Sequence, residues 1–229
     1  MKLKPQKLIL LIILTFQSII LIGQETKSVR YKVTSNSLLD IIEDYPEKKE
    51  SIENNIITST PKYVDFVLID GEIIQIYWSY QNNLMGIKFY SKEKIYSISP
   101  DNELMTENIS AEKDSIQFKR IETKNDSINK YVLVEKSAMP LTVVLKDRLE
   151  NDNFSHLTTH NGYPEISIIK DFKVFPEKYI FGKPKVFMSF DFLTDFKFEV
   201  FESKKEYLEF INDINSNEKR QLILEKISE

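Results

Sequence analysis

Residues 62–80 read KYVDFVLIDGEIIQIYWSY and decide the fold of this chain. Two runs of β-branched and aromatic residues flank the pair Asp70-Gly71. An Asp-Gly pair accepts the positive φ angles that a two-residue type I′ turn needs at both of its central positions. The stretch therefore predicts a β-hairpin, and it says nothing about chemistry.

Similar short runs precede and follow the hairpin, so we expect a meander of antiparallel strands. The predicted strands include residues 31–34, 84–90, 95–99, 115–122, 129–135, 140–145, 164–172 and 185–201. The stretches 102–114, 154–163 and 173–184 are polar or interrupted by glycine and proline, and we predict loops there. Strand alternation places Asp65 between Val64 and Phe66, so we expect its side chain on the solvent face.

Two helices are predicted before the hairpin. Apolar residues recur with helical spacing from Leu38 to Tyr45, and Pro46 can occupy the first position of a second helix over residues 46–57. We expect the Leu/Ile stripe of these helices to face the core. The alternative is a helix that binds a partner.

A closing helix is predicted over residues 203–227, because Ser203 and Glu206 have the spacing of a capping box, with an interruption at Ser216-Asn217. The whole pattern predicts a β-dominated α+β fold. We expect an antiparallel curved sheet of hairpins, with flanking helices near the N-terminus and at the C-terminus. Residues 24–229 are predicted to form a single β-rich domain, since no linker or repeat divides them.

The first 23 residues have the pattern of an export signal. Three lysines precede an apolar run over residues 8–23, which is shorter than the roughly 20 residues that span a bilayer. We expect a cleaved signal peptide and a periplasmic or secreted protein, and the alternative is an uncleaved amino-terminal anchor. The chain has no cysteine for disulfides or lipidation, and its net charge of −4 argues against nucleic-acid or anionic-membrane partners.

No metal or cofactor site is predicted. His156 and His160 are four residues apart, but the residues between them are poor helix formers and no glutamate stands where a metalloprotease needs its general base. We interpret both histidines as loop residues that satisfy local hydrogen bonds. The chain also lacks a Gly-x-Ser-x-Gly elbow, a Gly-x-Gly-x-x-Gly loop and a P-loop.

Paired carboxylates are the remaining route to catalysis, as in glycosidases. The candidates lie in the hairpin or in the late aromatic stretch: Asp65, Asp70, Glu72, Asp191 and Asp195. Acidic residues are so frequent here that such pairs are expected by chance, and the turn already explains Asp70. We therefore predict no catalytic residue.

Aromatic residues gather in the same two stretches and could line a pocket for a sugar or an apolar ligand. The candidate pocket residues are Tyr63, Tyr77, Trp78, Tyr80, Phe190 and Phe192. The alternative interpretation is core packing, because Tyr77 and Trp78 must point to opposite faces of a strand.

The order of these features resembles that of the GLPGLI-type exported proteins of Bacteroidetes. The resemblance covers residues 31–169 and includes Phe66, Leu68 and the Gly71-Glu72 pair. The motif that names the family is reduced to Gly162-Tyr163-Pro164-Glu165-Ile166, which keeps its Gly, Pro and Ile. The resemblance implies export and a β-rich fold, and it transfers no catalytic residue to this chain.

These observations favour an exported, non-enzymatic β-rich protein that binds an apolar or peptide-like ligand in the cell envelope. One alternative is an envelope accessory module that binds other proteins through a strand edge or the carboxy-terminal helix. A third is a glycan or peptide hydrolase that uses carboxylates near Trp78.

Overall fold

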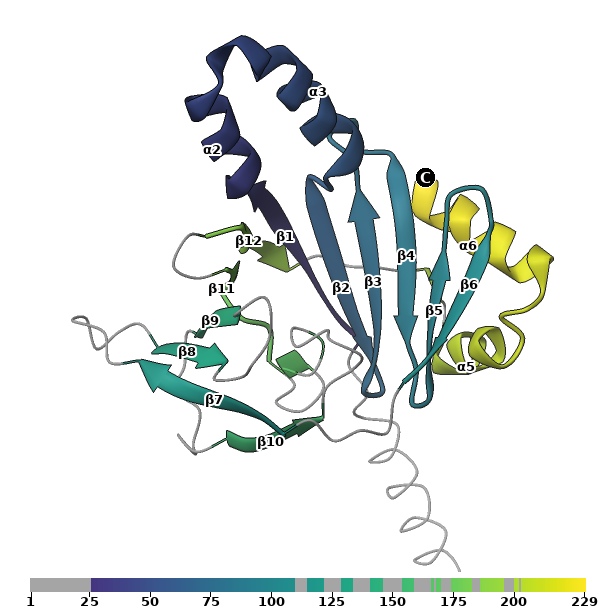
Figure 1. The fold of residues 1–229 in the computed structure, drawn as a ribbon. Coiled ribbons are helices and arrows are strands. Elements are labelled where there is room, and N and C mark those ends of the chain that lie inside the picture. Colours follow the sequence, from purple (N-terminus) through teal and green to yellow (C-terminus); the bar gives the residue numbers. More distant parts are fainter. Residues whose placement is uncertain are drawn as a thin grey trace, which may run out of the picture.

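The computed structural model describes residues 26–109, 115–121, 129–133, 141–145, 154–158, 166, 168–169, 174–182, 186–195, 200–201 and 203–229. The predicted export signal lies outside these residues. The strands of the described part form a 12-stranded antiparallel sheet in the order β10-β7-β8-β9-β11-β12-β1-β2-β3-β4-β5-β6 (Figure 1). Their bounds are β1 Lys27–Ser35, β2 Tyr63–Ile69, β3 Glu72–Trp78, β4 Leu84–Tyr90, β5 Lys94–Ile98, β6 Leu104–Asn108, β7 Ser115–Ile121, β8 Asn129–Leu133, β9 Leu141–Leu145, β10 Phe154–Thr158, β11 Lys178–Phe181 and β12 Met188–Asp195.

The β2–β3 hairpin forms as the sequence predicts. Asp70 has φ 52° and Gly71 has φ 81°, so both central residues of the turn are left-handed. Tyr63 pairs with Trp78 at the open end, and Ile69 pairs with Glu72 next to the turn. The β3–β4 and β5–β6 turns also use asparagine at positive φ, with 61° at Asn82 and 64° at Asn102.

Both faces of the central strands are buried, and this explains why β2 and β3 are almost continuously apolar. Phe66 belongs to a first core that also takes residues from β1, β9, β11 and β12. Its neighbour Val67 belongs to a second core on the opposite face, which α5 (Lys204–Asn212) and α6 (Asn217–Ser228) cover. Figure 1 shows these two helices together against the β4–β6 part of the sheet, and strands β7–β10 turned steeply away from β2–β4.

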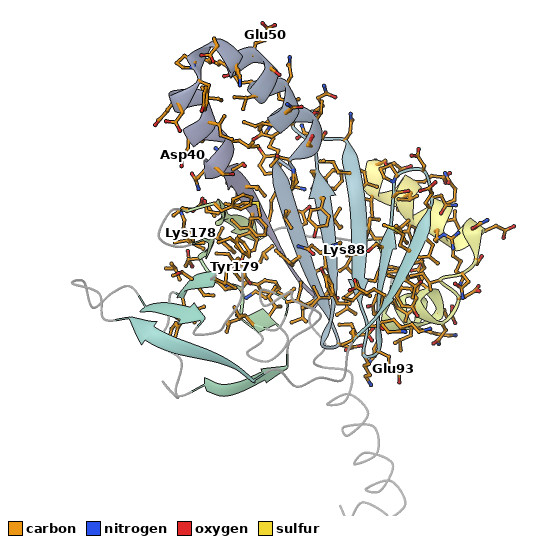
Figure 2. All side chains as sticks on the ribbon, in the orientation of Figure 1. Asp40, Glu50, Lys88, Glu93, Lys178 and Tyr179 are labelled. Atoms are coloured by element: carbon orange, nitrogen blue, oxygen red, sulfur yellow. The ribbon has the colours of Figure 1, made fainter. Side chains whose placement is uncertain are left out.

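The amino-terminal helices form where the sequence predicts them, but they do not pack as predicted. The helix α2 (Asn36–Asp44) leads through the short 3-10 helix η1 (Pro46–Lys48) into α3 (Lys49–Ser59). The expectation that the α2 stripe faces the core is wrong, because none of its residues is buried. The hairpin of helices extends past the strand ends (Figure 1), and Figure 2 shows Asp40 and Glu50 on its outer surface. Only Ile52 and Ile56 of α3 are buried.

Four other expectations are corrected. The strands β6, β10 and β11 lie within stretches predicted to be loops. β6 is a polar edge strand that backbone pairing with β5 holds in place, so its side chains show no alternation of hydrophobicity. In the stretch predicted as a strand over 164–172, the described residues are helical, and all three are buried in the first core: Ile166, Ile168 and Ile169.

Candidate functional site

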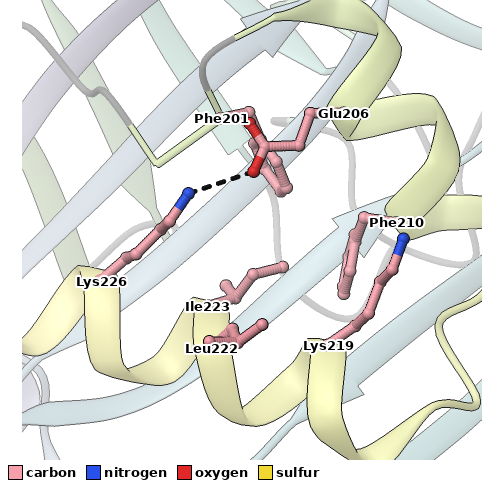
Figure 3. Close-up of a pocket in the computed structure, with 7 residues that line it drawn as sticks. All are labelled: Phe201, Glu206, Phe210, Lys219, Leu222, Ile223 and Lys226. Carbon is pink, nitrogen blue, oxygen red and sulfur yellow. Dashed lines mark hydrogen bonds and ion pairs between the residues drawn. The ribbon is translucent and has the colours of Figure 1, made fainter.

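An apolar pocket lies between the two carboxy-terminal helices (Figure 3). Its volume is about 110 Å³. Seven residues line it, from α5, α6 and the segment before α5: Phe201, Glu206, Phe210, Lys219, Leu222, Ile223 and Lys226. The walls are therefore mainly aliphatic and aromatic, and the charged groups stand at the rim.

The break between α5 and α6 creates this pocket. Ser203 Oγ accepts a hydrogen bond from Glu206 N at 3.2 Å, which starts α5 with the predicted cap. After α5 the chain turns, and the buried Arg220 fixes the start of α6. Its guanidinium donates to Ile214 O at 2.9 Å and to Asn102 Oδ1 at 3.0 Å, in the turn between β5 and β6. The two helices are thus held side by side on the second core.

Two aromatic rings form the floor of the pocket. Phe201 and Phe210 have ring centroids 5.6 Å apart, and Phe210 also contacts Phe89 of β4 at 4.8 Å. Phe210 is buried and Phe201 is half-buried against the second core, and packed cores deform little. The pocket is therefore a preformed feature of the helix pair.

Two lysines stand at the rim of the pocket, and they differ in their ionic and hydrogen-bond partners. Lys226 Nζ lies 3.1 Å from Glu206 Oε1 and 3.1 Å from Val200 O, so its ammonium is held on one side. Lys219 stands beside Phe210 (Figure 3) and forms no ion pair with any residue that the structure describes. A ligand in the pocket would therefore meet the paired ammonium of Lys226 and the ammonium of Lys219, which has no ion pair among the described residues.

A second notable site is an ion pair on the same face as the helices. Arg30 donates from Nε and Nη2 to the two carboxylate oxygens of Asp65, both at 2.7 Å, and Trp78 Nε1 donates to Asp65 Oδ2 at 2.6 Å. Asp65 has 0% exposure, so its predicted place on the solvent face is wrong. Burial raises the pKa of the Asp65 carboxyl, and the bonds from Arg30 and Trp78 oppose that shift.

The sheet separates the aromatic residues that the sequence proposed as one pocket. Tyr77, Phe192 and Phe190 lie on the first core. Tyr63 and Trp78 lie on the opposite face, where the Arg30 guanidinium stands 5.3 Å and 5.7 Å from their ring centroids. Tyr80 lies in the turn after β3. Ligand binding by any of these residues stays a prediction.

The proposed catalytic carboxylates are mostly engaged elsewhere. Asp191 pairs with Lys178 at 2.5 Å, and Asp70 pairs with Lys204 at 2.6 Å. One buried oxygen of Glu72 accepts no hydrogen bond from the part of the chain that the structure describes. Only the backbone of Asp195, at the end of β12, is described.

The structure describes neither histidine side chain. The backbone of His156 lies in β10, and His160 lies outside the described residues. Among the residues with described positions, no three His, Cys, Asp or Glu side chains gather where they could hold a metal ion. The described helices include none with the length and hydropathy to cross a membrane.

The fold and the pocket together define a β-dominated α+β protein with an apolar recess between its last two helices. Comparison of the chain with protein-family models, with curated proteins and with solved structures finds no match. The resemblance to the GLPGLI-type proteins therefore stays a prediction.

Proposed function

We propose that this chain is an exported, non-enzymatic binding protein that takes one apolar side chain of a peptide-like ligand in the pocket between α5 and α6. The observation behind the proposal is a preformed apolar recess whose only charged groups stand at its rim. Apolar walls with a few placed polar groups are typical of binding sites.

The size of the pocket favours a side chain over a whole lipid. An engineered protein cavity of about 150 Å³ binds benzene, whereas pockets for complete small ligands measure about 300–1,000 Å³. A volume of about 110 Å³ is therefore suited to one leucine- or phenylalanine-sized group. The rest of such a ligand would lie across the rim, where Lys219 can donate to a main-chain carbonyl or a carboxylate.

The alternative of a hydrolase has less support from the geometry. Asp65 is fully buried under Arg30 and Trp78, so a substrate cannot reach its oxygens without breaking three hydrogen bonds. Asp191 is accessible but paired with Lys178. The alternative of an accessory module that binds other proteins through a strand edge or the carboxy-terminal helix stays a prediction.

The test is a titration of the purified protein with the tripeptides Ala-Leu-Ala, Ala-Phe-Ala and Ala-Ser-Ala, followed by amide NMR. We expect the signals of α5 and α6 to shift with the Leu and Phe peptides and to stay unchanged with the Ser peptide. Leu222→Asp should abolish the shifts, because it places a charge on the pocket wall. Leu208→Asp is the matched control, since Leu208 is exposed on α5 and does not line the pocket.

Two results would contradict the proposal. One is the absence of shifts in α5 and α6 with the Leu and Phe peptides. The other is a lipid that copurifies with the protein, is found by mass spectrometry, and is not displaced by these peptides.

A further inference from the structure

The two ends of the pocket between α5 and α6 differ in charge. Four residues with helical spacing line the pocket from α6: Lys219, Leu222, Ile223 and Lys226. The two lysines are seven residues apart, which is about 10 Å along a helix axis, so they stand at opposite ends of the pocket (Figure 3). At one end, Lys226 Nζ lies 3.1 Å from Glu206 Oε1, and the pair carries no net charge.

The other end of the pocket has an uncompensated positive charge. Lys219 is half-buried there. The next residue, Arg220, is buried, and its guanidinium donates to three neutral acceptors: Asn102 Oδ1, Ile214 O and Asn217 Oδ1. None of the described carboxylates forms an ion pair with Lys219 or Arg220. Two cations therefore stand at consecutive positions of α6 without an anion to balance them.

The start of α6 adds to this positive charge. The helix begins at Asn217, and the side chain of Ser216 at its N-cap accepts no capping hydrogen bond. The N–H groups of a first turn carry a partial positive charge, so a lysine at this position is unfavourable and an anion is favourable. Glu218, the acidic residue of this turn, is exposed and does not line the pocket. Its carboxylate therefore does not occupy the place of an anionic ligand.

We infer that the pocket binds the carboxy-terminal residue of a peptide, with an apolar side chain inside the pocket and the terminal carboxylate on the ammonium of Lys219. The inference rests on the proposed function, whose substrate class it names. A volume of about 110 Å³ takes one side chain, and a carboxylate balances the positive end of the pocket. In a peptide, an apolar side chain and a carboxylate are attached to the same Cα only in the carboxy-terminal residue.

Other parts of a peptide fit this end of the pocket less well. A main-chain carbonyl of an internal residue can accept a hydrogen bond from Lys219, but it leaves the positive charge unbalanced, and charge-assisted hydrogen bonds are about twice as strong as neutral ones. The amino terminus of a peptide would bring a further positive charge to the same place. The rim therefore selects for the free carboxylate.

The test is isothermal titration calorimetry of the purified protein with acetyl-Ala-Ala-Leu, with the carboxy-terminal amide of the same peptide, and with 4-methylpentanoate. We expect the acid to bind about tenfold more tightly than the amide, because only the acid carries the charge that pairs with Lys219. 4-Methylpentanoate carries a leucine-sized group and a carboxylate without a peptide backbone, and it should bind more weakly than the acid peptide.

Two variants connect the preference to one ammonium. Lys219→Met keeps most of the apolar stem and should lower the affinity for the acid to that for the amide, while the affinity for the amide stays unchanged. The unchanged amide affinity also shows that this variant is folded. Lys205→Met is the matched control, because Lys205 is 86% exposed on α5 and does not line the pocket, and it should keep the tenfold preference.

Equal affinities of the wild type for the acid and the amide would overturn the inference and leave the proposed function standing, since both peptides carry the same leucine. A preference for the acid that survives Lys219→Met would also overturn it, because another group would then bind the carboxylate. If 4-methylpentanoate bound as tightly as the acid peptide, the ligand would be a small carboxylic acid instead. If neither peptide bound, the proposed function itself would be wrong, and the inference with it.

Discussion

The ion pair between Arg30 and Asp65 predicts an asymmetric response to mutation, although either substitution breaks the same bonds. Arg30→Met leaves a carboxylate with 0% exposure and no positive partner. Removing one partner of a buried pair costs about 3–5 kcal/mol, and this range applies to Arg30→Met. Asp65→Asn leaves a guanidinium that is 31% exposed, so water can solvate it, and the expected cost is about 1–2 kcal/mol.

The measurement is urea unfolding of the wild type, the two single variants and the double variant. Trp78 is the only tryptophan of the chain and donates to Asp65, so its fluorescence reports on this site directly. Far-UV circular dichroism gives the global transition. Asp191→Asn is the control, because both members of the Asp191–Lys178 pair are substantially exposed, and its loss should cost less than about 1 kcal/mol.

The pH dependence of Arg30→Met follows from the same reasoning. Burial already raises the pKa of Asp65, and the variant removes the main group that opposes this shift. Because the folded pKa then lies well above the unfolded value of about 3.9, stability falls as pH rises between the two values. The cost of Arg30→Met should therefore be smaller at about pH 5 than at about pH 7. Equal costs for the two single variants, or a cost of Arg30→Met below about 1 kcal/mol, would refute the reasoning.

Three further predictions concern local features. Burial, and then the nearby Glu72 carboxylate, raise the pKa of Tyr207 above the unfolded value of about 10. The free energy of unfolding of the wild type should therefore fall by about 1.4 kcal/mol per pH unit above pH 10 because of this residue. In urea titrations at alkaline pH, Tyr207→Phe should abolish this contribution to the pH dependence of stability. Gly71→Ala should lower the free energy of unfolding by about 1–2 kcal/mol, as measured by thermal unfolding, because alanine is strained at a φ of 81°. Nothing lies within 4 Å of the added Cβ, so a steric clash does not contribute. An unchanged stability would exclude the left-handed turn. Ser203→Ala should cost about 1 kcal/mol, while Ser203→Asp should restore stability if the hydroxyl acts as the cap of α5.

Local chemistry made the hairpin and the closing helices predictable. Asp70-Gly71 fixes its turn whatever surrounds it, and Ser203 with Glu206 caps α5 within four residues. The sequence could not place β6 or β11, because their pairing depends on neighbouring strands rather than on their own pattern. The helical spacing of α2 likewise predicts a helix without stating what covers it.

The site was harder to predict because it depends on packing between separate elements. Strand alternation alone predicts that Asp65 faces solvent. In the structure, the second core extends over that face of the sheet, and Arg30 of β1 pairs with Asp65. The pocket between α5 and α6 requires the angle at which Arg220 fixes the two helices. The aromatic residues, which looked like one cluster in sequence, are divided by the plane of the sheet.

The position of β1 in the sheet has a consequence for how the molecule assembles. This strand is the first to leave the ribosome, yet it lies between β2 and β12, which is the last strand of the sheet to be synthesised. Until β12 arrives, one edge of β1 is an open template for strands of other chains. Such a non-local pairing raises the contact order and slows folding, so a polypeptide cut short before residue 188 would be prone to aggregate.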